Sequence, residues 1–132
     1  MEKSEFVEYE MAKRLRGLGF DESCYAWHVS EDYGLAYGRV VQSDLLRDAL
    51  IAPTNSQVFR WFRDEHSLYG EILMDRTTSP KWAFEIHRYE DFGNYEKSEE
   101  KEWSLYRTYE EAEEDCLKRL CSIIELEDAQ GA

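Results

Sequence analysis

Three side chains that could share a cation or a proton fall on one predicted β-hairpin. Glu71 lies in the segment LYGEILMDR, and Glu85 and His87 lie two residues apart in KWAFEIHRY. Alternate residues of a strand point to the same face, so Glu85 and His87 share a face. Glu71 joins them if the residue numbers of each directly opposed pair in the hairpin have an even sum, because odd-numbered residues then lie opposite odd-numbered ones. Carboxylates and imidazole bind divalent cations and act as general acids and bases. The trio is the best chemical candidate in the chain, although on a face open to water it would be a solvated cross-strand set.

A second histidine, His66, ends the stretch APTNSQVFRWFRDEH, directly after Asp64 and Glu65. Consecutive helical residues diverge by about 100°, so these three side chains fan around the axis and do not converge on one ion. A histidine near a helix C-terminus commonly meets the helix dipole and the last carbonyl groups. We therefore interpret His66 as structural and keep it as the weaker alternative for a catalytic or metal-dependent site. Trp61 and Phe62 belong to the apolar core face of the same helix.

Signatures of other chemistries are missing from the sequence. There is no HExxH, no G-x-S-x-G, no P-loop and no G-x-G-x-x-G, so no motif assigns a catalytic residue, a cofactor or a metal ion. The three cysteines, Cys24, Cys116 and Cys121, form no CxxC pair. On one helix the last two would point about 140° apart, too divergent for a disulfide. We predict reduced, structural thiols.

The charge of the chain restricts its partners. Sixteen Lys and Arg against 29 Asp and Glu give a formal net charge of -13. This charge repels nucleic-acid backbones and anionic membrane surfaces, so we predict no direct nucleic-acid or membrane binding. The chain has no apolar run long enough for a signal peptide or a membrane span, which favours a cytoplasmic location.

The hydropathy pattern and the length of 132 residues predict a single α+β domain, residues 1–132. An antiparallel sheet of about three strands, centred on a hairpin from Tyr69 to Tyr89, should pack against N-terminal, middle and long C-terminal helices. The expected elements, in chain order, are a helix Ser4–Leu18, extended pieces between Phe20 and Val41, a short helix from Ser43, a helix Thr54–His66, the hairpin, a third strand WSLYRTY, and a helix from Thr108 to about Glu127 with a frayed tail at 127–132.

Two capping boxes mark helix starts in this scheme. Thr54 stands three residues before Gln57, and Thr108 stands three residues before Glu111, so each pair can satisfy two backbone N–H groups at a helix N-terminus.

The hairpin register follows from its apolar residues. Ile72 and Met74 alternate on one strand and Phe84 and Ile86 on the other, and all must face the core. We expect pairs such as Met74 with Phe84 and Ile72 with Ile86, joined by a loop of odd length. The acidic segment EDFGNYEKSEEKE that follows is too polar for a buried strand, and we predict an exposed excursion there.

Three segments together carry a resemblance to a known group. They are APTNSQVFRWFRDEH, EILMDRTTSPKWAFEIHRYEDFGNYEK and YRTYEEAEEDCLKRL, within Ala52 to Ile124. Their order resembles a family of small proteins, without an assigned activity, from gut Bacteroides-type bacteria and their phages. The resemblance implies kinship and a phage or mobile-element setting, and it implies no mechanism.

Three functional hypotheses follow. The first is a small acidic interaction or accessory protein whose partner is a protein, with Tyr69, Leu73, Tyr89 and the acidic excursion as a partner surface. The second is a small enzyme or metal-dependent site that uses Glu71, Glu85 and His87. The third is a nucleic-acid mimic that binds a basic protein.

Overall fold

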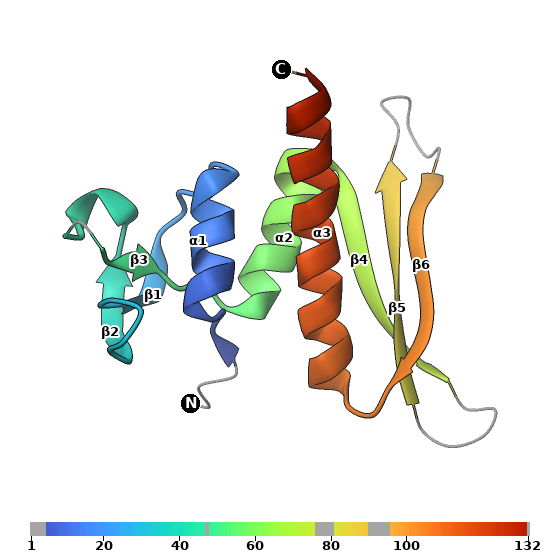
Figure 1. Cartoon of the computed structure of the whole chain (residues 1–132), viewed down its shortest axis with the longest axis horizontal. Helices are drawn as coiled ribbons and strands as arrows, with labels where there is room; N and C mark the ends of the chain where they lie inside the picture. Colours follow the sequence, from blue (N-terminus) through green and yellow to red (C-terminus); the bar gives the residue numbers. More distant parts are fainter. Residues whose placement is uncertain (1–4, 47, 76–80, 90–95, 132) are drawn as a thin grey trace. The chain divides into compact units, whose positions relative to one another are not determined.

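The computed structural model describes residues 5–46, 48–75, 81–89 and 96–131. It has an α+β fold, as predicted, with helices and antiparallel sheets (Figure 1). The chain forms two compact units, residues 1–58 and residues 59–132. The number of domains stays a prediction.

The first unit is a small sheet with one helix. Its strands are antiparallel in the order β2-β1-β3, and its core contains Phe6, Ala26 and Ala52. The elements are α1 (Tyr9–Gly17), β1 (Cys24–His28), β2 (Leu35–Val40), the 3-10 turn η2 (Gln42–Asp44) and β3 (Leu50–Ile51).

The helix α1 ends where the sequence GLGF predicts. Gly19 has a φ of 96°, in the left-handed region that glycine adopts without strain. The N–H of Gly19 donates to the carbonyl of Arg16 at 3.1 Å, and the N–H of Phe20 donates to the carbonyl of Leu15 at 3.0 Å. These two bonds form a Schellman motif that satisfies carbonyls left open at the helix end.

Two predictions in this unit are wrong. The helix starts at Tyr9 and not at Ser4, because Phe6 pairs with Thr54 in an antiparallel bridge. The expected short helix from Ser43 is replaced by η2 and β3. The side chain of Gln42 bonds the carbonyl of Ala49 at 2.8 Å and the N–H of Ile51 at 3.0 Å, so it holds this loop in a shape that lets β3 pair with β1.

The helix α2 (Asn55–His66) begins at the predicted cap. The N–H of Gln57 donates to Oγ1 of Thr54 at 3.2 Å, which confirms half of the capping box. The other half is wrong, because the Gln57 amide donates to the Ser23 carbonyl at 2.9 Å and the Glu22 carboxylate at 3.1 Å. This glutamine therefore joins α2 to the loop before β1.

The second unit is a three-stranded antiparallel sheet, ordered β4-β5-β6, with a long helix along one face (Figure 1). Buried Phe84 and Ile86 lie on the helix side of the sheet, and buried Cys116, Leu120 and Ile124 recur on the helix. Arg88 also forms an ion pair with Glu127 across this interface. The elements are β4 (Leu68–Asp75), β5 (Lys81–Tyr89), β6 (Glu96–Tyr106) and α3 (Tyr109–Gly131).

The helix α3 starts at the second predicted cap. The N–H of Glu111 donates to Oγ1 of Thr108 at 3.1 Å. The helix then continues to Gly131, through residues for which the sequence predicts a frayed tail.

The hairpin register has the predicted parity but not the predicted pairs. Ile72 lies opposite Phe84 and Met74 opposite Trp82, so the numbers sum to 156 and not to 158. Asp75 pairs with Lys81 as the last described pair of the ladder. The predicted loop of odd length falls on residues 76–80, which lie outside the described residues. Each residue therefore lies on the predicted face of the sheet, but its partner is two residues earlier on β5 than predicted.

The third strand is longer than the sequence predicts. β6 includes the predicted WSLY portion and begins already at Glu96, so residues 96–102 form part of the strand and not the predicted excursion before it. Residues 90–95 of that excursion lie outside the described residues. A polar sequence is tolerated in β6 because it is an edge strand, bonded to β5 alone.

Gly70 supplies the first test of this packing. A methyl group added at Gly70 would lie 2.8 Å from Cε1 of Phe59 and 3.0 Å from Sγ of Cys116. We expect Gly70→Ala to lower the free energy of unfolding by about 1–3 kcal/mol, as overpacking usually does. The measurement is urea unfolding followed by circular dichroism.

Gly17→Ala is the matched control for that experiment, since no heavy atom lies within 4 Å of its added methyl group. It sits in a helix, where alanine is preferred by roughly 0.5–1 kcal/mol. Equal stability of the Gly70→Ala variant and the wild type would contradict the close packing of α3 on β4.

Candidate functional site

The hairpin brings Glu71, Glu85 and His87 to one face of the sheet. Glu71 lies directly opposite Glu85 in the β4–β5 ladder, and His87 follows Glu85 by two residues on β5. Phe84 and Ile86, which alternate with them, are buried on the side of α3. The trio therefore faces away from α3, as the sequence predicts.

The three side chains converge. Nε2 of His87 lies 3.1 Å from Oε2 of Glu85, within hydrogen-bond and ion-pair distance. One ligand atom from each of the three residues lies within 4.8 Å of the other two. Among the residues that the structure describes, this is the one group of three His, Cys, Asp or Glu side chains with such geometry.

The trio is not a fully solvated set. The side chains of His87 and Glu85 are each only 18% exposed, whereas Glu71 is exposed. Two partly buried side chains, Glu85 and His87, are thus held together on the central strand, and Glu71 approaches them from the edge strand β4. In the backbone register, β6 places Lys101 opposite Glu85 and Ser98 opposite His87.

Electrostatics make the site receptive to positive charge. Two carboxylates directly opposite each other on a ladder repel and weaken the pairing. The neighbouring imidazole of His87 offsets part of that repulsion through its contact with Glu85. A shared cation would offset more, because it attracts both carboxylates and accepts the neutral imidazole as a ligand.

The spacing suits a small divalent ion. Zinc lies about 2.0–2.2 Å from nitrogen and carboxylate oxygen ligands, so two ligands of one ion are separated by roughly 3–4 Å. The pair of His87 and Glu85 already has this separation, at 3.1 Å. Glu71 adds an exposed carboxylate, with one oxygen within 4.8 Å of the ligand atoms of the other two residues.

His66 is placed as a structural residue. Its ring lies at the end of α2, with centroids 4.9 Å from Trp61 and 5.8 Å from Phe62. Burial lowers the pKa of His66, and nearby Glu65 opposes this effect. Nε2 of His66 is buried and has no hydrogen-bond partner within the described part of the chain. Neither His66 nor Glu65 joins the cluster on the hairpin.

A lowered pKa at His66 makes stability depend on pH. The unfolded chain, with a histidine pKa of 6.5, binds the proton more readily than the folded chain does. This contribution to stability is therefore present above about pH 6.5 and is lost as the pH falls through the folded value. We expect His66→Phe, which keeps a ring against Trp61, to lose less stability than the wild type between pH 7.5 and pH 5.5.

Urea unfolding of both proteins at the two pH values measures this difference. An identical loss of stability in the wild type and in His66→Phe would show that His66 titrates alike in the folded and unfolded chains.

His28 is also structural, a role for which the sequence gives only a weak signal. It is 6% exposed, and its Nε2 donates to the backbone carbonyl of Val7 at 2.8 Å. The ring also meets Tyr9 edge-on, with centroids 5.8 Å apart. Cys24, Ala26 and His28 alternate along β1 and are all buried, and this alternation is the sequence signal that predicts burial of His28.

Burial disfavours the reactive thiolate form of Cys24 and Cys116. Cys24, Cys116 and Cys121 are all buried thiols outside any disulfide, as the sequence predicts. Burial raises the pKa of Cys24 from 9.0 to about 12, and the nearby charge of Glu22 raises it further. Burial and Glu113 also raise the pKa of Cys116. The reactive thiolate forms are therefore suppressed near neutral pH.

A thiol-reactive dye tests this burial directly. At pH 8 the native protein should react slowly with dithionitrobenzoate, and the three cysteines should all react rapidly in guanidinium chloride. A rapid reaction of one equivalent in the native state would instead reveal an accessible thiolate.

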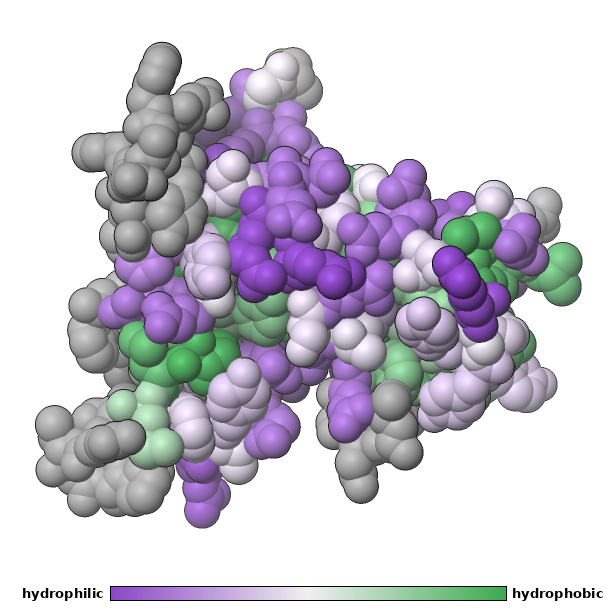
Figure 2. All heavy atoms as spheres, turned by 180° about the vertical axis from the view of Figure 1, so that it is seen from behind, coloured by the Kyte–Doolittle hydropathy of each residue, from purple (hydrophilic) through white to green (hydrophobic). Residues whose placement is uncertain are grey.

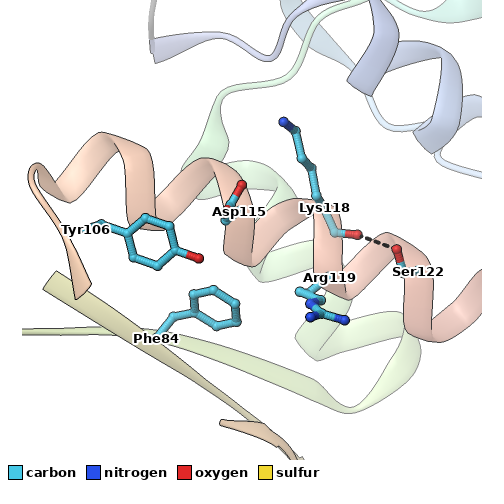
Figure 3. A pocket seen from close by; sticks show the side chains of 6 residues that line it. All are labelled: Phe84, Tyr106, Asp115, Lys118, Arg119 and Ser122. Atoms are coloured by element: carbon cyan, nitrogen blue, oxygen red, sulfur yellow. Dashed lines mark hydrogen bonds between the residues drawn. The ribbon is translucent and has the colours of Figure 1, made fainter. Parts of the chain in front are cut away.

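A shallow pocket lies between α3 and the sheet within the second unit. Its volume is about 260 Å³, and its lining consists of Phe84, Tyr106, Asp115, Lys118, Arg119 and Ser122. Figure 3 shows the rings of Phe84 and Tyr106 side by side, while the Lys118 side chain extends away from them. Ser122 donates to the carbonyl of Lys118 at 3.0 Å. Ligand pockets usually measure about 300–1,000 Å³, so this one is small for an organic ligand.

The surface is mainly hydrophilic on the face shown in Figure 2, where hydrophobic side chains gather in smaller areas between polar ones. Of the proposed partner surface, Tyr69 is 40% exposed and Leu73 is half-buried. The Tyr89 side chain lies outside the described residues.

Comparison with known proteins adds no relative. No protein-family model matches the chain, and neither curated proteins nor solved structures give a match. Within the described ranges, no helix combines the length and the apolar character needed to cross a membrane.

Proposed function

We propose that this protein binds a divalent metal ion through Glu71, Glu85 and His87. The observation that carries the proposal is the convergence of one nitrogen and two oxygen ligand atoms within 4.8 Å of one another. Two of these ligands, Glu85 and His87, are partly buried and already 3.1 Å apart. A site with this preorganisation loses little side-chain entropy when the ion arrives.

The donor set favours a transition metal over calcium or magnesium. Imidazole suits Zn²⁺ and similar ions, whereas Ca²⁺ and Mg²⁺ take oxygen ligands. Three protein ligands also leave at least one coordination position for water or a substrate, as in catalytic zinc sites. An ion in such a site acts as a Lewis acid and lowers the pKa of bound water. This is the chemistry that the enzyme hypothesis needs.

The charge of the whole chain supports the same proposal. A formal net charge of -13 attracts cations toward the protein and raises their concentration near its surface. The other hypotheses stay predictions: an acidic interaction or accessory protein of phage or mobile-element origin, a nucleic-acid mimic, and a cytoplasmic location.

Titration of the metal-free protein with Zn²⁺ or Mn²⁺ in a calorimeter tests the proposal. We expect one ion per chain, and a binding affinity at least about tenfold lower in His87→Gln and in Glu85→Gln. Loss of an outer-shell partner alone commonly weakens binding by about 10–100-fold, and these residues are ligands. Millimolar Mg²⁺ should not displace the ion.

Glu114→Gln is the control, since it removes one exposed carboxylate from α3 without touching the cluster. It should bind the ion like the wild type. Equal affinities of the wild type, His87→Gln and Glu85→Gln would reject the site, as would the absence of saturable binding.

A further inference from the structure

Three aromatic side chains gather at the end of the second unit where β6 leads into α3 (Figure 1). The ring of Trp82 on β5 meets the ring of Tyr109, the first residue of α3, with centroids 5.3 Å apart and planes at 87°. Tyr106, the last residue of β6, lies directly opposite Trp82 in the ladder. Opposed residues share a face and have Cβ atoms about 4.5–5.5 Å apart. We call Trp82, Tyr106 and Tyr109 the aromatic corner.

The aromatic corner is only partly buried. Tyr109 is 40% exposed, and Trp82 and Tyr106 are half-buried. Met74, opposite Trp82 on β4, is 44% exposed, whereas Phe84, two residues farther along β5, is 1% exposed. The corner therefore closes the end of the core and also presents aromatic surface to solvent. An exposed apolar cluster rimmed by charged residues is a usual mark of a binding site.

The charge beside the aromatic corner is negative. Burial raises the pKa of the Tyr109 hydroxyl, and the charge of Glu113, together with the hydrogen bond that its carboxylate accepts from this hydroxyl, raises it further. Glu113 thus lies next to the corner. The N-terminal dipole of α3 amounts to roughly +0.5 charge, which the acidic side chains of its first turns outweigh. Residues 106–115 hold one cation, Arg107, and five carboxylates: Glu110, Glu111, Glu113, Glu114 and Asp115.

The ring geometry suits a cation without hydrogen-bond donors. The face of an aromatic ring is its negative side, and it attracts a cation that lies within about 6 Å of the centroid. Two rings at right angles, such as Trp82 and Tyr109, offer their faces to one cation from two sides. An ammonium group whose hydrogens are replaced by methyl groups leaves no N–H donor unpaired when it lies against such rings.

We propose that the aromatic corner binds a quaternary ammonium group. The corner lies on the α3 side of the sheet, because Trp82 alternates with buried Phe84 and Ile86 on β5. The metal cluster lies on the opposite face, so this site does not depend on the proposed metal binding. A quaternary ammonium group arrives on a free solute such as choline or on a methylated lysine side chain, and the same chemistry recognises both.

Calorimetric titration of the full chain with choline chloride at constant ionic strength tests the site. We expect saturable binding that is at least about threefold weaker in Trp82→Leu and in Tyr109→Leu, as the loss of one cation–π contact implies. Tyr109→Phe keeps the ring and should bind choline nearly as the wild type does. Because the Tyr109 side chain is exposed, Tyr109→Leu keeps the test decisive even if Trp82→Leu fails to fold, which circular dichroism shows.

Tyr25→Leu is the matched control, since it removes a tyrosine that is 66% exposed in the first unit. It should bind choline like the wild type. Dimethylbutanol, the uncharged isostere of choline, and ammonium chloride are the comparison ligands, because the first lacks the charge and the second lacks the methyl groups.

Three results would overturn the assignment. The first is choline binding no tighter than that of dimethylbutanol or ammonium, and the second is an equal loss of affinity in Tyr109→Leu and Tyr25→Leu. The third is a lack of binding by both choline and acetyl-trimethyllysine amide. If both bind, the tighter of the two identifies the source of the group, a free solute for choline and a protein side chain for the trimethyllysine compound.

Discussion

The burial of Phe84 and Ile86 against α3 determines the arrangement of the second unit. Side chains alternate between the two faces of a strand, so once Phe84 and Ile86 enter the core, the side chains of Glu85 and His87 must point to the opposite face. Glu85 and His87 therefore share the outer face as a consequence of core packing. The same constraint extends across the ladder to β4, where Gly70 and Ile72 lie on the helix side and Glu71 on the outer side.

Local signals in the sequence were sufficient for the starts of α2 and α3 and for the faces of the hairpin. Thr54 and Thr108 cap their helices through contacts three residues away, which a sequence shows directly. The exact register was not predictable, because it depends on the loop at 76–80 and on packing beyond the hairpin. The expected pairs would have placed Glu71 opposite His87, whereas the structure places it opposite Glu85. Parity alone was enough to identify the candidate site.

Long-range contacts explain what the sequence could not show. The apolar spacing after Ser43 favours a helix, yet Gln42 and the pairing of β3 with β1 stabilise another structure. The polar segment that enters β6 likewise has no strand pattern of its own and depends on the hydrogen bonds that β5 offers. Arg63 lies over the ring of Tyr69 across a turn in which Ser67 has a φ of 56°, a left-handed conformation that serine adopts rarely and that the sequence does not predict.

The unequal burial of the three candidate ligands has a kinetic consequence. Glu85 and His87 form a covered pair on the central strand, while Glu71 stands exposed on an edge strand. A cation arriving from solution would meet the exposed Glu71 carboxylate first and would reach the covered pair as that side chain moves, because exposed side chains change rotamer in picoseconds to nanoseconds. Release would follow the reverse path and end at Glu71. Such a site exchanges its ion with solution readily, in contrast to an enclosed structural metal centre.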